Sequence, residues 1–187
     1  MTTIVGIAGS ARQGSYNRAL LGAAVEIAPP EVTLDAHDIG GIPLYDGDLE
    51  AEQGIPERVT ELKDLIAAAD GLLLASPEYN NSLPGPMKNA IDWLTRPPKD
   101  IGRVFGDRPV GLIGATPGRG GTRLAQTAWL PVFRTLSMRP WFGKNLYVAG
   151  AGQLFDDQLR LTDDTTRTQL AEYVRGFVEF VEGCRTG

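Results

Sequence analysis

Short apolar runs separated by longer amphipathic segments dominate the pattern of the chain. Residues 4–8, Gly71–Ala75 and Pro109–Ala115 are continuous apolar runs with the length of a buried parallel strand. Residues 138–148 predict a further strand, and the alternation of apolar and polar positions over residues 32–36 indicates an edge strand. The chain is therefore expected to build a five-stranded sheet.

Amphipathic segments of helical period fill the intervals between these strands. In each of them apolar residues recur three or four positions apart, as one buried helix face requires. The positions are Leu20, Ala24 and Ile27; Val59, Leu62 and Ile66; Met87, Ala90, Ile91 and Leu94; and Leu170, Val174, Phe177 and Val181. A further helix is expected over residues 123–136, where Pro131 should cause a kink or detach the last turn. Residues 38–56, rich in glycine and proline, predict a long surface loop.

Strands and helices alternate along the chain without an internal repeat, which predicts a single doubly wound α/β domain over residues 1–187. In a parallel sheet with the strand order 2-1-3-4-5, the first and third strands are neighbours at the point where the winding reverses. Ligands bind at this switch point, beyond the carboxyl ends of the strands. The loops after the first, third and fourth strands are therefore the candidate sites.

The loop after the first strand has the composition of a phosphate-binding site. Ser10 and Ser15 offer hydroxyl groups, and Arg12 offers a fixed positive charge between two glycines that allow tight turning. Ser15 is the natural N-cap of a helix that begins at about Tyr16, whose free N–H groups and dipole favour an anion. The side-chain amide of Asn17 can add a donor. An ordinary serine- and glycine-rich turn is the competing interpretation.

Three better-known loops do not fit these residues. The dinucleotide fingerprint G-x-G-x-x-G is absent, because no glycine triplet has the required spacing. Residues 9–14 match the first half of a P-loop, but Ser15 and Tyr16 stand where a lysine and a hydroxyl residue are needed. The serine of a hydrolase nucleophile elbow has a glycine two positions before it and another two positions after it, whereas Ser10 has Ala8 and Arg12 there. Nucleoside triphosphate hydrolysis and serine-hydrolase chemistry are thus disfavoured.

The loop after the third strand suits the edge of a heterocyclic ring. Pro77 stiffens the exit from the strand, and Tyr79 offers an aromatic face. Backbone amides from Glu78 onward, together with Asn80, can donate to acceptors along the ring. A proline- and asparagine-rich turn is the competing interpretation. The loop after the fourth strand, residues 116–123, has glycines that let the backbone approach a ligand. Arg119 and Arg123 could attract a phosphate of a second substrate, but solvated arginines are preferred.

Three side chains leave alternatives open. Asp35 or Asp38 could bind a ribose hydroxyl in a dinucleotide fold, but without the glycine fingerprint solvated carboxylates are preferred. Trp93 follows the apolar face of the helix that contains Met87, so it either lies in the core or anchors a subunit interface.

Composition narrows the classes of function. With 187 residues, 42% of them hydrophobic and 22% charged, the chain has the profile of a globular domain. The net charge of -5 disfavours nonspecific nucleic-acid binding, which needs a basic face. One cysteine, Cys184, and one histidine supply neither a disulfide framework nor a zinc site. No targeting or membrane-spanning segment is apparent, so a cytoplasmic location without a membrane partner is expected.

Three motifs together resemble one known family. Residues 9–17 (Gly-Ser-Ala-Arg-Gln-Gly-Ser-Tyr-Asn), 76–80 (Ser-Pro-Glu-Tyr-Asn) and 84–93 (Pro-Gly-Pro-Met-Lys-Asn-Ala-Ile-Asp-Trp) resemble motifs of the NADPH-dependent FMN reductase family, in the family's order. This family includes chromate, quinone and azo-dye reductases. The resemblance spans nearly the whole chain and implies a flavodoxin-like three-layer fold, non-covalently bound FMN and a homodimer or homotetramer.

By motif match, the resemblance implies two groups of FMN-binding residues. The phosphate side would comprise Ser10, Arg12, Ser15, Tyr16 and Asn17, and the isoalloxazine side Pro77, Glu78, Tyr79, Asn80 and Ser82. Thr116 stands where the family commonly has a serine beside the ring, and it keeps the hydroxyl group. Residues 88–93 resemble the family's dimer helix, and the loop around Asp46 resembles the segment that borders a neighbouring subunit's flavin.

The activity implied by the resemblance is hydride transfer from NADPH or NADH through FMN to a small acceptor such as a quinone, free flavin, an azo compound or chromate. FMN carries this chemistry, so no catalytic protein nucleophile, general base or metal is expected. Backbone amides near Asn80 and Thr116 would stabilise negative charge on the reduced ring. A flavodoxin-type electron carrier that does not oxidise NAD(P)H, and a nucleotide-binding module without flavin, are the alternatives.

Overall fold

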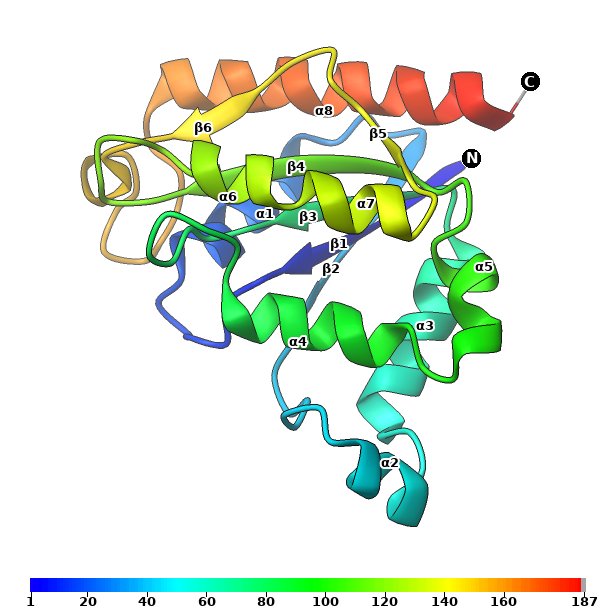
Figure 1. The fold of residues 1–187 in the computed structure, drawn as a ribbon. Helices are drawn as coiled ribbons and strands as arrows, with labels where there is room; N and C mark the ends of the chain where they lie inside the picture. Colours follow the sequence, from blue (N-terminus) through cyan, green and yellow to red (C-terminus); the bar gives the residue numbers. More distant parts are fainter. Residues whose placement is uncertain (186–187) are drawn as a thin grey trace.

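The computed structural model describes residues 1–185, which build one parallel sheet with helices on both faces (Figure 1). The strands are β1 (Thr2–Ala8), β2 (Val32–Asp38), β3 (Gly71–Ala75), β4 (Pro109–Ala115), β5 (Arg139–Pro140) and β6 (Leu146–Val148). Their order is β2-β1-β3-β4-β5, and β6 also pairs with β4. The predicted flavodoxin-like order 2-1-3-4-5 is thereby confirmed.

Eight α-helices and two short 3-10 helices lie within the described residues. They are α1 (Tyr16–Ile27), α2 (Gly47–Gln53), α3 (Glu57–Ala68), α4 (Gly85–Leu94), η1 (Pro98–Asp100), α5 (Ile101–Val104), α6 (Arg123–Ala128), α7 (Leu130–Thr135), η2 (Ala151–Gln153) and α8 (Asp164–Arg185). The predicted α/β alternation is therefore correct, although several elements differ from the prediction in their extent.

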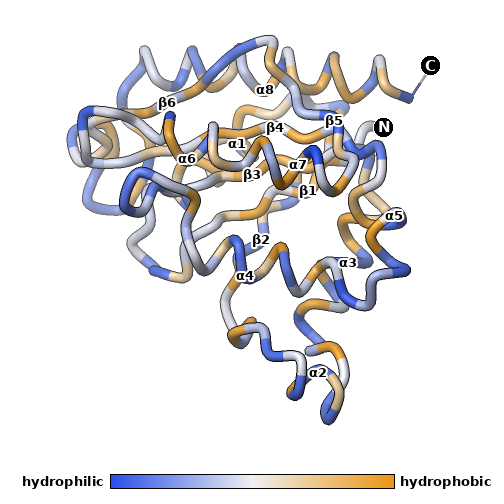
Figure 2. Tube along the Cα trace, viewed as in Figure 1, coloured by the Kyte–Doolittle hydropathy of each residue, from blue (hydrophilic) through white to orange (hydrophobic). Residues whose placement is uncertain are grey.

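Two apolar cores fill the space between the sheet and its helices. α1 and α8 cover one face, where Leu20 and Phe177 are buried. α3, α4 and the α5–α7 segments cover the other face, around Trp93 and Trp129. Figure 2 shows the central strands as largely hydrophobic and the helices as alternating in hydropathy. All five residues of β3 are buried, as expected of a strand with helices on both faces.

The predicted fifth strand is wrong in its extent. Two short strands replace it, with β5 pairing to the start of β4 and β6 to its end. Residues 141–145 leave the sheet between them, because the ring of Trp141 packs edge-on against Tyr173 of α8, with centroids 4.8 Å apart. The N–H of Leu112 in β4 therefore donates to the Tyr173 hydroxyl at 2.8 Å.

The helix expected over residues 123–136 is broken near its middle rather than at its last turn. Trp129 joins α6 to α7, and Pro131 lies in the first turn of α7. A proline is tolerated there because N–H groups of the first turn have no intrahelical acceptor. The structure thus confirms that Pro131 interrupts the helix, and of the two expected forms it shows a break near the middle and not a detached last turn.

The segment of residues 38–56 is not wholly irregular, contrary to the prediction. α2 forms within it because Asp46 Oδ1 accepts the N–H of Asp48 at 2.9 Å, and Gly54, with φ of 78°, ends the helix. No residue of α2 is buried, and the helix projects from the body of the molecule (Figure 1). We call residues 43–54 the α2 arm.

Two contacts fasten the α2 arm to α4 and its C-terminal extension. The carbonyl of Pro43 accepts hydrogen bonds from Asn89 Nδ2 at 2.8 Å and from Trp93 Nε1 at 2.9 Å. Arg96 Nε donates to Glu50 Oε2 at 2.8 Å and lowers the pKa of that carboxyl. The ion pair therefore persists as pH falls to the ordinary glutamate pKa, and it is lost below that value.

Trp93 lies in the core of the chain. Its side chain is fully buried, at 0% exposure, and its ring is edge-on to Tyr45 with centroids 5.0 Å apart. The structure therefore decides between the two alternatives for Trp93, because its ring is covered by residues of its own chain.

We expect Trp93→Ala to lower the free energy of unfolding by about 3–5 kcal/mol, the usual effect of deleting a large buried aromatic side chain. Denaturant unfolding followed by far-UV circular dichroism measures this change. Lys99→Ala is the control, because Lys99 is exposed and forms no ion pair among the described residues, so its loss should change the stability by less than about 0.5 kcal/mol. Unchanged stability in Trp93→Ala would contradict the core assignment.

Candidate functional site

Three loops meet at the carboxyl ends of β1, β3 and β4. The strands end level with one another, because Ala8 of β1 lies opposite Ala75 of β3. The N–H of Gly9 donates to the carbonyl of Ala75 at 2.9 Å, and the N–H of Ser76 donates to that of Ile113 in β4, also at 2.9 Å. The loops singled out from the sequence are therefore neighbours at the switch point of the sheet.

The first loop presents two buried hydroxyl groups at the start of α1. Ser15 is the N-cap, and its Oγ accepts the N–H of Arg18 at 3.4 Å. Ser10 Oγ accepts the N–H of Arg12 at 3.4 Å. Ser10 is only 4% exposed and Ser15 only 2%. Neither hydroxyl hydrogen has an acceptor among residues 1–185. Both hydrogens are therefore available to an anion, beside the N–H groups of the first helical turn.

One unpaired cation stands at this loop. Arg12 is exposed and forms no ion pair within the described part of the chain, whereas Arg18 is paired with Asp38. Asp38 also accepts the N–H of Gly40 at 2.9 Å, so this carboxylate is paired within its own chain although its side chain stays 28% exposed. Asp35 is exposed, as expected of a solvated carboxylate. Two hydroxyl groups, a helix N-terminus and one free guanidinium form a donor set that fits a phosphate monoester, such as the phosphate of FMN.

Asn17 has a structural role that the sequence did not predict. Its side chain is 4% exposed, its Nδ2 donates to the carbonyl of Ala115 at 2.8 Å, and its Oδ1 accepts the N–H of the same residue at 2.9 Å. These two bonds join the first turn of α1 to the end of β4. The second hydrogen of Nδ2 has no acceptor among residues 1–185, so its donation to an anion stays a prediction.

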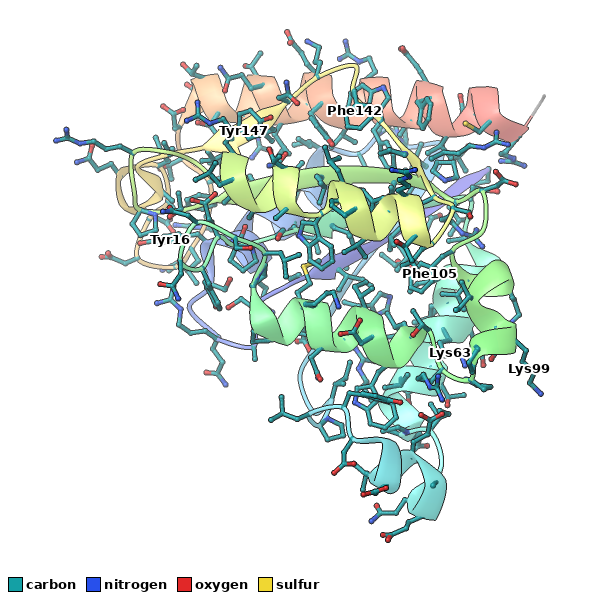
Figure 3. The ribbon with its side chains drawn as sticks, viewed as in Figure 1. Tyr16, Lys63, Lys99, Phe105, Phe142 and Tyr147 are labelled. Carbon is teal, nitrogen blue, oxygen red and sulfur yellow. The ribbon has the colours of Figure 1, made fainter. Side chains whose placement is uncertain are left out.

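Tyr16 begins α1 and points toward the C-terminal half of the chain. Its ring packs against Phe155, with centroids 5.5 Å apart and a tilt of 41°. Figure 3 shows Tyr16 at the end of the molecule where the loops gather. The group of Tyr16 that can contribute to an anion site is therefore its backbone N–H, in the first turn of α1. Its ring instead packs against Phe155.

The second loop is a tight turn. Asn80 and Asn81 have φ of 51° and 60°, the left-handed conformation that asparagine tolerates. The N–H of Tyr79 donates to the carbonyl of Ser82 at 3.1 Å, and the reverse bond has the same length. These two amides are therefore not free, which corrects the expectation for the backbone from Glu78 onward. Within the described residues, the N–H groups of both asparagines lack an acceptor.

Glu78 and Ser76 tie this turn to the helices beside it. Glu78 Oε2 accepts the N–H groups of Leu124 and Ala125 at 2.8 and 3.0 Å, and so caps α6, whose own N-cap residue makes no side-chain bond. Trp129 Nε1 donates to Ser76 Oγ at 2.8 Å. The carboxylate of Glu78 therefore faces a helix rather than a ring. The sequence pattern could not show this cap, because the acid and the helix are far apart in the chain.

The third loop places Thr116 at the same edge of the sheet. Its N–H donates to the carbonyl of Val148 at 2.9 Å, and its Oγ1 accepts the N–H of Gly118 at 3.3 Å. The hydroxyl hydrogen has no acceptor among the described residues, so it can donate to a ligand. Arg119 and Arg123 are exposed and form no ion pair within residues 1–185, in agreement with the expected solvated arginines.

The described residues contain neither a metal-binding cluster nor a membrane-spanning helix. Within residues 1–185, three or more histidine, cysteine, aspartate or glutamate side chains do not gather in a way that could hold a metal ion. None of the helices in that part of the chain is both long and apolar enough to cross a membrane.

The fold is that of a flavodoxin-like protein, and the donors at the switch point of its parallel sheet are suited to a phosphorylated ligand. The model of the NADPH-dependent FMN reductase family matches residues 2–153. The chain belongs to this family, and it is an FMN-dependent oxidoreductase that uses NAD(P)H.

Individual relatives agree with the family assignment. The chain is 39% identical over 182 residues to an NAD(P)H-dependent FMN reductase of Pseudomonas aeruginosa, covering 97% of this chain and 96% of that one. It is 34% identical over 179 residues to a 2-hydroxy-1,4-benzoquinone reductase of a Burkholderia species, covering 96% of each. The solved structure of a flavoenzyme NAD(P)H:(acceptor) oxidoreductase from Paracoccus denitrificans superposes with a TM-score of 0.85 and 32% identity, covering 98% of both chains.

We expect Asn17→Leu to lower the free energy of unfolding by about 2–5 kcal/mol, because it leaves the buried N–H and carbonyl of Ala115 unpaired. Asn17→Asp provides a sharper test. Only its protonated form can donate to the carbonyl of Ala115, so the folded state raises the pKa of the new carboxyl.

Stability of Asn17→Asp should therefore fall as pH rises above the ordinary aspartate pKa, between about pH 4 and pH 8. Denaturant unfolding across this range gives the profile. Asn145→Asp is the matched control, because Asn145 is exposed and makes no described side-chain hydrogen bond. Parallel profiles for the two variants would show that the Asn17 amide does not hold Ala115.

Proposed function

We propose that the three loops form one site in which FMN is held, reduced by NAD(P)H and reoxidised by a quinone-type acceptor. The observation that carries this proposal is the pair of buried serine hydroxyls beside an unpaired Arg12 at the start of α1. Bound FMN would supply the hydride chemistry, as flavins do in other enzymes. The chain itself binds, orients and shields the reacting groups.

The first loop would hold the phosphate. Ser10 and Ser15 would donate from their hydroxyls, Arg12 would supply the charge, and the N–H groups of Tyr16 and Asn17 would complete the cradle. Since the serines are already buried and ordered by contacts within the loop, little conformational entropy is lost when the anion binds.

The second and third loops would hold the ring. The N–H groups of Asn80 and Asn81 and the hydroxyl of Thr116 are the donors left free by the fold, and they suit carbonyl and nitrogen acceptors along a heterocycle. Pro77, Glu78 and Ser82 would act by fixing the shape of the turn. Negative charge that develops on the ring would be stabilised by these fixed dipoles.

Tyr79 would cover the ring from the side of solvent. Its side chain is 42% exposed, although it follows directly on a buried strand, so an aromatic face is available beside the turn. A planar donor and a planar acceptor can use one open face in succession. The site therefore needs no separate pocket for each substrate.

Quinone-type acceptors are favoured by the relatives, one of which reduces 2-hydroxy-1,4-benzoquinone. Free flavin, azo compounds and chromate are further acceptors within the proposal. NADPH and NADH are both candidate donors. The proposed location is the cytoplasm, which is supported by the single cysteine in the sequence.

The proposed assembly is a homodimer or homotetramer. The α2 arm supports this part of the proposal, because it projects from the body and carries Leu44, 82% exposed, beside Tyr45, 39% exposed. Such apolar side chains on a projecting segment are suited to contact a second copy of the chain.

The absorbance spectrum of FMN-loaded, desalted protein tests the function. Under anaerobic conditions, NADPH or NADH should bleach the bound flavin, and benzoquinone should restore its absorbance. Rapid bleaching by one nucleotide identifies the donor. Retained flavin that neither nucleotide bleaches would point to an electron carrier, and loss of flavin on desalting would contradict the site itself.

We expect Arg12→Ala to weaken FMN binding by about 10- to 100-fold, because the phosphate loses its charged partner. Titration of the apoprotein with FMN, followed by quenching of flavin fluorescence, gives the dissociation constant. Arg134→Ala is the matched control, since this arginine of α7 is also exposed and forms no ion pair among the described residues. Equal affinities for the two variants would remove Arg12 from the phosphate site.

A further inference from the structure

A cavity of about 190 Å³ lies beside the middle of β4, on the edge of the sheet where β5 and β6 fail to join. None of the residues proposed to hold FMN lines it. Its walls come from α6, α7, α8 and the segment between β5 and β6. The flavin chemistry leaves this space unexplained.

The cavity exists because residues 141–145 replace the middle of an edge strand. Trp141 turns toward α8 and packs on Tyr173, and the absence of a side chain at Gly176 leaves room for its ring. On its outer edge, opposite β3, β4 therefore lacks a strand partner at Leu112, and no side chain fills the full width of the gap. A space of this size can hold a six-membered ring, since a cavity of about 150 Å³ binds benzene.

Aromatic rings form much of the wall. Phe133, Trp141 and Tyr173 line the cavity in its interior. Phe142 and Tyr147 also line it but are 65% and 38% exposed, so they lie where the cavity opens to solvent. Figure 3 shows both residues along the chain from β5 to β6, beside α8. Such walls favour a flat aromatic ligand through edge-to-face and stacked contacts.

Gln126 supplies a hydrogen-bond acceptor. Its Nε2 donates to Thr122 Oγ1 at 3.1 Å and to the carbonyl of Leu146 at 3.0 Å. The carbonyl of Leu146 can only accept, so it fixes which end of the amide is nitrogen. The side chain is only 6% exposed, and its Oε1 has no donor among residues 1–185. The oxygen itself is not sealed from solvent, so it is a reachable acceptor on an otherwise buried residue that lines the cavity.

Tyr173 supplies a hydrogen-bond donor. Its hydroxyl oxygen accepts the N–H of Leu112, and its hydrogen has no acceptor among the described residues. Burial raises the pKa of this phenol, so the group keeps its proton at neutral pH. The cavity is thus lined by one free acceptor and one free donor, each on a buried side chain.

We propose that this cavity is a second small-molecule site, which binds a neutral single-ring phenol or hydroquinone. The ring fits the aromatic walls, and a phenolic hydroxyl can donate to Gln126 and accept from Tyr173 at once. A charged ligand is disfavoured, because the one cation in the lining, Lys144, is paired with Glu172 at 2.5 Å. The inference stands independently of the proposed acceptor.

Calorimetric titration of the FMN-loaded protein with phenol tests the proposal. We expect saturable binding with a dissociation constant on the order of 1 mM, typical of so small a ligand. Toluene, which has the same ring but no hydroxyl, should bind about tenfold more weakly, because it makes neither polar contact. The absence of saturable phenol binding, or equal affinity for phenol and toluene, would overturn the proposal.

A matched pair of variants distinguishes this cavity from the face of the flavin. Thr127 of α6 lines the cavity, is exposed, and donates to the carbonyl four residues earlier at 3.0 Å. Thr168 of α8 makes the same type of bond at 2.9 Å but lies outside the cavity. Thr127→Phe should fill the space and weaken phenol binding at least about tenfold, whereas Thr168→Phe should leave it unchanged.

Two control measurements show whether Thr127→Phe is correctly folded. The far-UV circular dichroism and FMN affinity of Thr127→Phe should equal those of the unsubstituted protein. Crystals of the unsubstituted protein soaked in phenol should show the ring between Gln126 and Tyr173. Unchanged phenol affinity in Thr127→Phe, or density for phenol only at the flavin, would overturn the assignment.

Discussion

Two hydrogen bonds between the amide of Asn17 and the backbone of Ala115 connect the two sides of the switch point. One side is the N-terminus of α1, which directs the donors of the first loop, and the other is the end of β4, from which the third loop begins. Because both bonds are buried, breaking either of them leaves a polar group without water or partner. The distance between the first and third loops depends on this junction.

The remaining loop is held by helices rather than by the sheet. Glu78 caps α6, and Trp129 binds Ser76, so the turn at Asn80 keeps its position relative to the helices on one face. The second and third loops, and the helix that follows the first, are thus each held by hydrogen bonds to another element of the fold. This arrangement favours a preformed site, in which binding energy is not spent on ordering the backbone.

The sequence predicted the sheet order and the gathering of three loops at one edge of the sheet, because both follow from strong periodic signals and from local turn chemistry. It did not predict contacts made over long separations in the chain. The bonds from the Asn17 amide to Ala115 and the cap that the Glu78 carboxylate forms on α6 were not predicted, because their partners lie on other elements. The extent of the fifth strand was wrong for the same reason: the packing of Trp141 on α8 overrides an apolar run that favours a strand.

The interrupted edge beside β4 also has a consequence for colloidal behaviour. An exposed strand edge is a template on which another chain can add a strand, and long apolar edges promote such growth. Here the outer strands span only two and three residues, and the hydroxyl of Tyr173 occupies the N–H of Leu112 between them. The sheet therefore ends on this side in fragments too short to nucleate intermolecular pairing, and a feature that opens a cavity also protects the protein from edge-to-edge aggregation.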